Sequence, residues 1–338
     1  MRRAAIIALS FALLAFLFGC SALRRQKGAG QAMIGCMHDL NTIAELHEFL
    51  RTKSKGESEV ERPLEGMEVA LTINGMVHRN VDKSEEEDYW CRDENSVANF
   101  HKMVDALKRN EMPPTVDFIA ARWSDPELQE KWLKAGNLIG SLTFERQKAH
   151  GFTAEEFIDD LKKTDQVLSP LMIKDSQRQR YFRYPRLKRA LNPGDQSVVG
   201  AYLKKTGYAE VPATIDSLDS KFSELFCKAS SRGDQACANL IKGYFTPLLL
   251  DSALRARMIA NEIMGRDVKH IMMLEATQFT SDNLDEILKF CKRMGVKFIT
   301  LDEALADPFY QRTTREGGSE AVDLLRRVQK RQTGESDE

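Results

Sequence analysis

Short apolar segments alternate with amphipathic ones along most of the chain, and this alternation constrains the fold more than any other feature. The amphipathic segments, such as residues 95–110 and 280–295, repeat their apolar residues with the period of a helix. The apolar segments are short and predict buried strands at residues 67–73, 115–121, 180–185, 209–216, 270–277 and 296–301, with 138–144 as a short strand or loop. This pattern predicts an α/β fold in which helices cover the parallel strands of a barrel-like sheet.

Local signals mark where several of the helices begin. An Asp-Pro pair at residues 125–126 opens one helix. Thr153 and Glu156 have the spacing of a capping box at the start of another. Two separate helices, at residues 227–245 and 249–265, are predicted before the strand at 270–277.

The start of the chain has a different pattern. The basic residues of MRR are followed by an uncharged run at residues 4–19. This run is short for a membrane-spanning helix and typical of a secretory signal core. It ends in LFGC, which resembles the cleavage motif of bacterial lipoproteins, with Cys20 as the residue that would carry the lipid. A plain membrane anchor or an uncleaved helix is the alternative.

Lipidation of Cys20 would hold the protein to a bilayer through its acyl chains. Ser21, rather than an Asp, follows this Cys, which resembles sorting to the outer membrane facing the periplasm rather than retention at the inner membrane. The formal net charge is −1, so charge gives no case for a nucleic-acid partner. The predicted divisions are a signal peptide (1–19), a tether (20–35), a helical segment (36–65), a barrel (66–312) and a charged, partly disordered tail (313–338).

Export would place the remaining cysteines in an oxidising compartment, where they can form disulfides. Cys227 and Cys237 flank a Gly-containing turn between helices, so a local bridge is possible. Cys36 and Cys91 could then tie the N-terminal segment to the barrel. Cys291 lies on the apolar face of a helix and is predicted to be a buried free thiol.

Several segments resemble, in order and spacing, motifs of the polysaccharide deacetylases, which remove acetyl groups from chitin-like sugars and peptidoglycan. They are LTINGMVHRN (71–80), MPPTVDFIAAR (112–122), WLKAGNLIGSLTFER (132–146), YFRYP (181–185) and the closing strand, helix and strand within 270–310. The resemblance covers roughly residues 66–310 and implies a distorted seven-stranded β/α barrel.

The resemblance also implies a metal-dependent chemistry. In the family, one Asp and two His hold a divalent metal, usually zinc, which polarises the acetamide carbonyl and activates a water. A second Asp is the general base and is oriented by an Arg, and a further His protonates the leaving amine.

This chain departs from the family at most of these positions. Its residues there are Asn74 for the general base, Gly75 for the metal-binding Asp, Leu142 and Arg146 for the metal-binding His pair, Glu275 for the leaving-group His, and Arg183, which is retained. Asn cannot accept a proton at neutral pH, and Gly and Leu offer no ligand atom. We therefore expect no metal or other cofactor, and a scaffold that is inactive as a deacetylase.

Glu275 has two interpretations. It could pair with Arg183 or Arg146 and balance the charge left without the metal, because an unpaired buried Arg is costly. It could instead act with Asp216 or Asp219 in metal-free hydrolysis, as paired carboxylates do in glycosidases.

Four residues are candidates to line a groove: Trp123, Trp90, His78 and His150. The two Trp residues follow predicted strands and could stack on a sugar, although packing within the protein is the simpler interpretation. The two His residues could join a nearby Glu in a rebuilt metal centre, although exposed loop histidines are the simpler interpretation.

The leading hypothesis is an exported, membrane-anchored pseudoenzyme that binds a cell-wall glycan or a protein partner without turnover. One alternative is an active hydrolase of carbon–nitrogen bonds other than peptide bonds, with a rearranged site. The other is a purely structural envelope lipoprotein.

Overall fold

The computed structural model describes residues 62–76, 96–144, 152–174, 179–187 and 191–310. The predicted signal peptide, the tether and the C-terminal tail therefore lie outside the described residues, as does most of the segment 36–65. None of the described helices combines the length and the hydropathy that crossing a bilayer requires.

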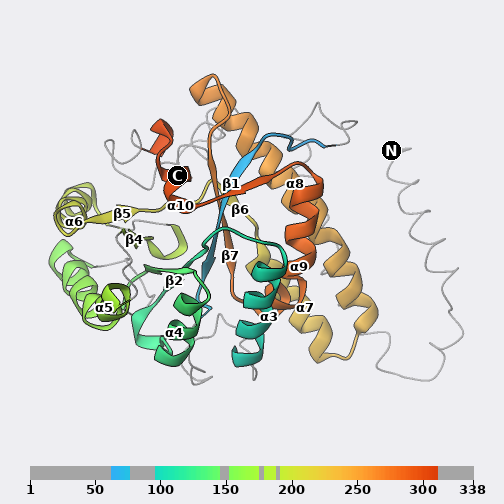
Figure 1. Cartoon of the computed structure of the whole chain (residues 1–338), viewed down its shortest axis with the longest axis horizontal. Coiled ribbons are helices and arrows are strands. Elements are labelled where there is room, and N and C mark those ends of the chain that lie inside the picture. The colour runs from blue at the N-terminus through green and yellow to red at the C-terminus, as the bar shows by residue number, and fades with distance from the viewer. Residues whose placement is uncertain (1–61, 77–95, 145–151, 175–178, 188–190, 311–338) are drawn as a thin grey trace, which may run out of the picture.

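A sheet of parallel strands forms the centre of the described structure (Figure 1). Its order is β5-β4-β3-β2-β1-β7-β6, and β8 also pairs with β1. The strands are β1 (Glu68–Asn74), β2 (Val116–Ile119), β3 (Leu138–Ser141), β4 (Arg180–Phe182), β5 (Tyr208–Glu210), β6 (Ile215–Asp216), β7 (His270–Glu275) and β8 (Lys297–Ile299). The predicted α/β fold of the seven-stranded barrel type is confirmed. The prediction of a single strand at 209–216 is wrong, because β5 pairs with β4 and β6 pairs with β7, at the two ends of the strand path.

Helices cover the outside of this sheet (Figure 1). They are α3 (Ser96–Arg109), α4 (Pro126–Lys134), α5 (Ala154–Lys174), α6 (Pro193–Lys205), α7 (Asp219–Ser231), α8 (Gln235–Met264), α9 (Gln278–Arg293) and α10 (Leu301–Leu305), with 3-10 turns η2 (Ala121–Trp123) and η3 (Pro185–Leu187). Asp125 caps α4 by accepting from the N–H groups of Glu127 and Leu128. Thr153 and Glu156 exchange hydrogen bonds ahead of α5, which confirms the predicted capping box.

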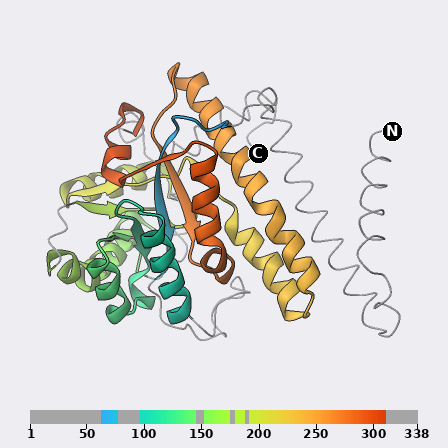
Figure 2. The same cartoon turned by 45° about the vertical axis from the view of Figure 1, so that its right-hand side comes forward.

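The predicted Gly-containing turn between Cys227 and Cys237 is confirmed, whereas the predicted break between one helix ending at 245 and another beginning at 249 is wrong. Instead, α7 ends at Ser231 and α8 runs unbroken through Pro247. A proline removes the hydrogen bond to the carbonyl four residues earlier, here that of Gly243. Both Gly243 and Pro247 are exposed, so water can solvate this carbonyl, while Leu248 is buried on the other face and holds the helix to the core. The two helices α7 and α8 lie side by side as a hairpin (Figure 2).

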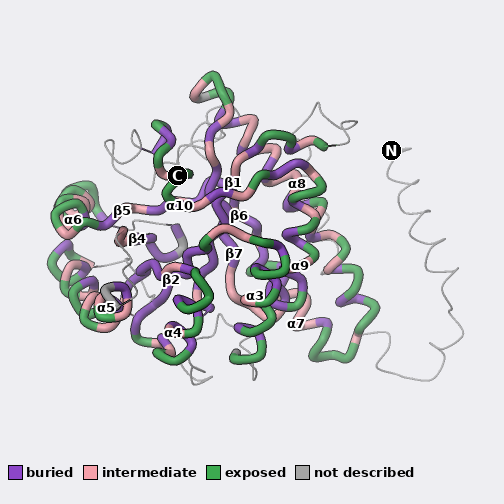
Figure 3. The backbone as a smooth tube through the Cα atoms, in the orientation of Figure 1, coloured by how far each residue is buried: buried purple, intermediate pink, exposed green. Residues whose placement is uncertain are grey.

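Alternate residues of the strands enter two separate cores. Val69, Leu71 and Ile73 of β1 belong to the outer core, together with Phe100 of α3 and Ile287 of α9. This alternation follows from the two-residue period of a strand. Figure 3 shows that the strands are buried, while the solvent side of the helices is exposed.

The inner core lies within the curve of the sheet. Ala70, Phe118, Leu142 and Tyr181 contribute to it from four neighbouring strands or strand ends. The ring of Phe118 covers Gly140 so closely that a Cβ atom on Gly140 would stand 2.6 Å from the ring. The fold therefore requires a residue without a side chain at this position.

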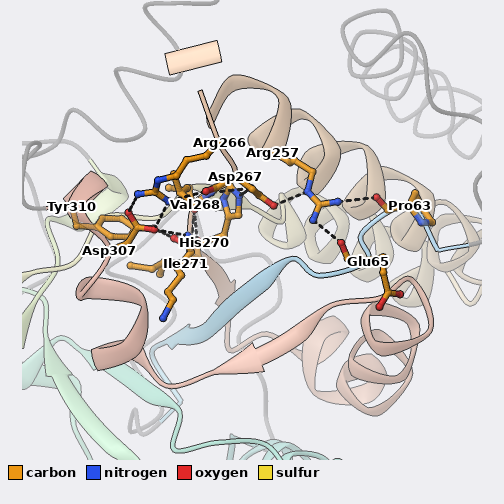
Figure 4. Close-up of polar contacts among 12 residues, drawn as sticks. Pro63, Glu65, Arg257, Arg266, Asp267, Val268, His270, Ile271, Asp307 and Tyr310 are labelled. Carbon is orange, nitrogen blue, oxygen red and sulfur yellow. Dashed lines mark hydrogen bonds and ion pairs between the residues drawn. The ribbon is translucent and has the colours of Figure 1, made fainter. Parts of the chain in front are cut away.

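A polar network lies at the amino-terminal end of β7, away from the carboxyl ends of the strands (Figure 4). Arg257 of α8 donates to the carbonyl oxygens of Pro63 and Glu65 and forms a 2.7 Å ion pair with Asp267. The other oxygen of Asp267 accepts from the buried ring of His270 over 3.0 Å. These contacts fix the segment just before β1 against α8, and they join α8 to the start of β7.

The cysteine pattern can be followed only in part. Cys227 and Cys237 are both disulfide-bonded, whereas Cys36 and Cys91 lie outside the described residues, so the predicted connectivity stays a prediction. Cys291 is a buried free thiol, as predicted, and burial raises its pKa to about 12.

Candidate functional site

The carboxyl ends of the central strands bring together residues that are far apart in the sequence. Asn74 ends β1, Glu275 ends β7, and the two residues are register partners. Arg183 follows β4, and Asp219 follows β6 at the start of α7. We call this end of the sheet, with Asn74, Arg183, Asp219 and Glu275, the barrel mouth.

Arg183 is buried, and protein acceptors surround its guanidinium group. Its Nε donates to the carbonyl oxygen of Val211 over 3.1 Å, Nη1 to Oδ1 of Asn74 over 3.0 Å, and Nη2 to Oγ1 of Thr72 over 2.9 Å. The group also lies 4.0 Å over the ring of Phe118. Burial lowers the pKa of Arg183 to about 9, and the negative charge of Glu275 opposes this shift.

Asn74 stands between Arg183 and Glu275. Its Oδ1 accepts from Arg183, and its Nδ2 donates to Oε1 of Glu275 over 3.0 Å. The two charges that the sequence predicted to pair are thus joined through a neutral carboxamide. The other predicted partner, Arg146, lies outside the described residues.

Asp219 lies behind Glu275 and holds its backbone. One carboxylate oxygen of Asp219 accepts from the N–H of Glu275 and from the hydroxyl of Thr280, each over 2.7 Å. The other accepts from the hydroxyl of Ser217 over 2.7 Å. Burial, and then the charge of Glu275, raise the pKa of Asp219 to about 7.

Residues 81–211 match a family model that is described as polysaccharide deacetylase. This segment of the chain is similar to that family. The predicted family resemblance is therefore confirmed, on a matched segment that spans β2 to β5.

Similar solved structures include carbohydrate esterases of family 4 (CE4). A CE4 pseudoenzyme from Bacillus anthracis has 16% sequence identity and a TM-score of 0.44, over 72% of this chain and 66% of that one. A mutant of this pseudoenzyme with restored enzymatic activity has 18% identity and a TM-score of 0.46, over 72% and 68%. Bacillus subtilis PdaA, a family 4 carbohydrate esterase, has 16% identity and a TM-score of 0.44, over 79% and 88%. No curated protein matches the chain in sequence.

The described residues at the metal positions of the deacetylase family do not fit a divalent cation. Gly75 has no side chain, adopts a positive φ of 81°, and donates its N–H to the carbonyl oxygen of Phe118. Leu142 is buried in the inner core. Within the described ranges, no group of three or more His, Cys, Asp or Glu side chains is arranged to hold a metal ion.

The two carboxylates considered as partners of Glu275 differ in placement. Asp219 contacts the backbone of Glu275 and is almost fully buried. Asp216 is half-buried at the end of β6, where its Oδ1 accepts from the N–H of Leu218 in the turn to α7. Asp219 is thus joined directly to the backbone of Glu275.

Sequence reasoning missed the hydroxyl groups of the barrel mouth. Thr72 binds Arg183, while Ser217 and Thr280 bind Asp219. A signal existed for Thr72, because it lies two residues before Asn74 and so shares its face of β1. Ser217 likewise lies two residues before Asp219, in the turn between β6 and α7. Thr280 carries no comparable sequence signal, since the packing of α9 sets its position.

Of the four candidate groove residues, the structure describes only Trp123. It lies in η2 after β2 and is half-buried, with the guanidinium of Arg122 positioned 4.8 Å from the centre of its ring. One side of the ring is thus occupied by the chain itself. Trp90, His78 and His150 lie outside the described residues.

Proposed function

We propose that this chain is an envelope lipoprotein whose deacetylase-like barrel binds a cell-wall glycan without hydrolysing it, with a protein partner as the alternative occupant. The observation that carries the proposal is the double role of Asn74. Its carboxamide accepts from Arg183 on one side and donates to Glu275 on the other.

This double role suits an amide and not a general base. An ionised Asp at position 74 could accept from Arg183 but would have no hydrogen to donate to Glu275. It would instead set one carboxylate against another. Asn74 and Glu275 thus form a matched pair, which supports a barrel mouth adapted to a role other than proton abstraction.

The residues at the family's metal-ligand positions support the same proposal. Gly75 and Leu142 offer no ligand atom, so the described residues give no means of polarising an acetamide carbonyl through a metal. The mouth keeps hydrogen-bonding groups of Glu275 and Asp216, both half-buried, which suit the hydroxyl groups of a sugar.

The proposed anchor rests on the sequence motif at Cys20. Lipidation would keep the barrel at the membrane, and the proposed location is the outer membrane, facing the periplasm. Mass spectrometry of the chain expressed in a bacterium tests this proposal. A diacylglyceryl group on an N-terminal Cys20 supports it, and an unmodified thiol on a soluble chain contradicts it.

Turnover and binding are tested on the same purified protein. Zinc content and acetate release are measured with acetylated glucosamine oligomers and with peptidoglycan, and retention on insoluble peptidoglycan is measured in parallel. Retention without acetate release or stoichiometric metal supports the proposal. Acetate release with bound metal contradicts it, and a chain that binds no wall polymer and no protein favours a purely structural role.

A second candidate is metal-free hydrolysis by Glu275 and Asp219. The observation in its favour is the raised pKa of Asp219, about 7, beside a second carboxyl group. Glu275→Gln separates the two functions, because it abolishes hydrolysis by this pair. If glycan cleavage or acetate release occurs in the wild type and disappears in Glu275→Gln, the second candidate function, metal-free hydrolysis, is correct.

A further inference from the structure

Asp219 is a buried carboxyl group whose hydrogen bonds come from neutral donors. It is 1% exposed, and its partners are the hydroxyls of Ser217 and Thr280 and the backbone N–H of Glu275. None of the ion pairs among the described residues involves it. A buried carboxylate without a cation has lost its hydration and gains no opposite charge in return, so burial favours the protonated form.

The hydroxyl of Ser217 adds a geometric reason for protonation. Its oxygen lies 2.7 Å from Oδ1 of Asp219 and 2.9 Å from the carbonyl oxygen of Met273. A serine hydroxyl has one hydrogen, so it can donate to only one of these two acceptors at a time. An ionised Asp219 therefore competes with the backbone of β7 for this hydrogen.

A protonated Asp219 removes the competition. The hydrogen on its Oδ1 is donated to Ser217, and Ser217 then donates to Met273. Its Oδ2 still accepts from Glu275 and Thr280. The neutral form thus makes one hydrogen bond more than the ionised form, and this extra bond joins the start of α7 to β7.

The charges around Asp219 act in the same direction. From β7, Glu275 presents a like charge, and from α9 the neighbour is the neutral hydroxyl of Thr280. The contact of α7 with α8 is apolar at Phe222 and Phe245. Arg183 is linked to Glu275 through Asn74 and makes no hydrogen bond with Asp219. Burial and the charge of Glu275 raise the pKa of Asp219 to about 7, and they outweigh the hydrogen bonds from Thr280, Ser217 and the N–H of Glu275, which favour the ionised form.

We propose that Asp219 is a proton switch of the barrel mouth, whose neutral form ties α7 to β7 through Ser217 and whose ionised form loosens this tie and repels Glu275. The switch itself does not depend on a ligand. Its effect on a bound glycan rests on the proposed function, because Glu275 is then the side chain whose charge and placement the ligand meets.

The first test compares the unfolding free energy of the full chain with that of Asp219→Asn between pH 4 and pH 9. The Asn side chain has the shape of the neutral carboxyl and can still donate to Ser217. Because the folded pKa, about 7, lies above the ordinary value of 3.8, the folded chain binds the proton more tightly than the unfolded chain. The wild type should therefore lose stability relative to Asp219→Asn as the pH rises from about 4 to 7, with its folded-to-unfolded ratio falling by up to about tenfold per pH unit.

Asp216→Asn is the matched control, because Asp216 lies at the same end of the sheet and is half-buried. Its stability should follow the wild type across this pH range. Parallel curves for the wild type and Asp219→Asn would overturn the proposal. So would an Asp216→Asn variant that removes the wild-type pH dependence as completely as Asp219→Asn does.

A second measurement covers the case in which Asp219→Asn does not fold. Infrared spectra of the wild type are recorded from pH 5 to pH 9, and the carbonyl band of a protonated buried carboxyl group is followed. This band should disappear with a midpoint near pH 7, and Glu275→Gln should move the midpoint to lower pH by removing the like charge. The absence of the band at pH 5, or a midpoint unchanged in Glu275→Gln, would overturn the proposal. Both tests use the free protein, so a failure to bind glycan leaves their outcomes unaffected.

Discussion

The side-chain nitrogen of Asn74 donates to Oε1 of Glu275 over 3.0 Å, across two strands whose register sets these residues opposite each other. The oxygen of the same carboxamide accepts from the buried guanidinium of Arg183. One short neutral side chain therefore links a fully buried cation to a half-buried carboxylate. Substitutions at these three residues should therefore lower the free energy of unfolding by different amounts.

Asn74→Leu should destabilise the fold by about 1–3 kcal/mol, because it leaves one donor of the buried Arg183 without an acceptor. Glu275→Gln keeps an oxygen for Asn74 and should cost less than about 1 kcal/mol. Denaturant unfolding of both variants measures the difference. Equal stability of Asn74→Leu and the wild type would contradict the bridging role of Asn74.

Arg183→Lys should destabilise by about 2–4 kcal/mol, because a single ammonium group cannot reproduce the fork that reaches Asn74, Thr72 and the carbonyl of Val211. Arg122→Lys, at an exposed position in η2, is the matched control and should stay within about 0.5 kcal/mol of the wild type. Thermal unfolding of both proteins checks this prediction. A tolerated lysine at position 183 would mean that the three acceptors do not need the guanidinium.

Gly140→Ala should destabilise by about 1–3 kcal/mol, because its Cβ would stand 2.6 Å from the ring of Phe118. The double variant Gly140→Ala with Phe118→Leu should be more stable than the sum of the two single changes predicts. A double-mutant cycle measures this coupling. Additive effects would show that the two residues do not compete for the same space.

Asp267→Asn should make the chain less stable at pH 7, and the difference from the wild type should shrink below about pH 4. Burial raises the pKa of Asp267, but the contacts with His270 and Arg257 outweigh burial, so the pKa lies below its ordinary value of 3.8. A lowered carboxyl pKa contributes stability above the unfolded value, and this stability is lost as the pH falls through the folded value. Acid unfolding curves of both proteins measure the effect, and a constant difference down to pH 2 would contradict it.

Hydrophobic patterning was sufficient to predict most strands of the sheet, because each strand buries a short run of neighbouring residues. It could not show that the run at 209–216 divides into β5 and β6, because that division depends on which distant strand each half pairs with. Helix starts at Asp125 and Thr153 followed from local capping chemistry in the same way. The unbroken α8 could not be predicted, because Pro247 normally ends a helix and only its exposed setting makes the lost hydrogen bond tolerable.

The sequence by itself determined which residues stand at the barrel mouth, since Asn74, Arg183 and Glu275 were singled out by motif position alone. It did not determine how they are joined. The link through Asn74 depends on the pairing of β1 with β7, whose residues are about two hundred positions apart. The contacts of Asp219 with Glu275 and Thr280 likewise depend on how α7 packs against β7 and α9. Only the tertiary structure decides such contacts, because local propensity carries no information about which distant backbone and hydroxyl groups will surround a buried charge.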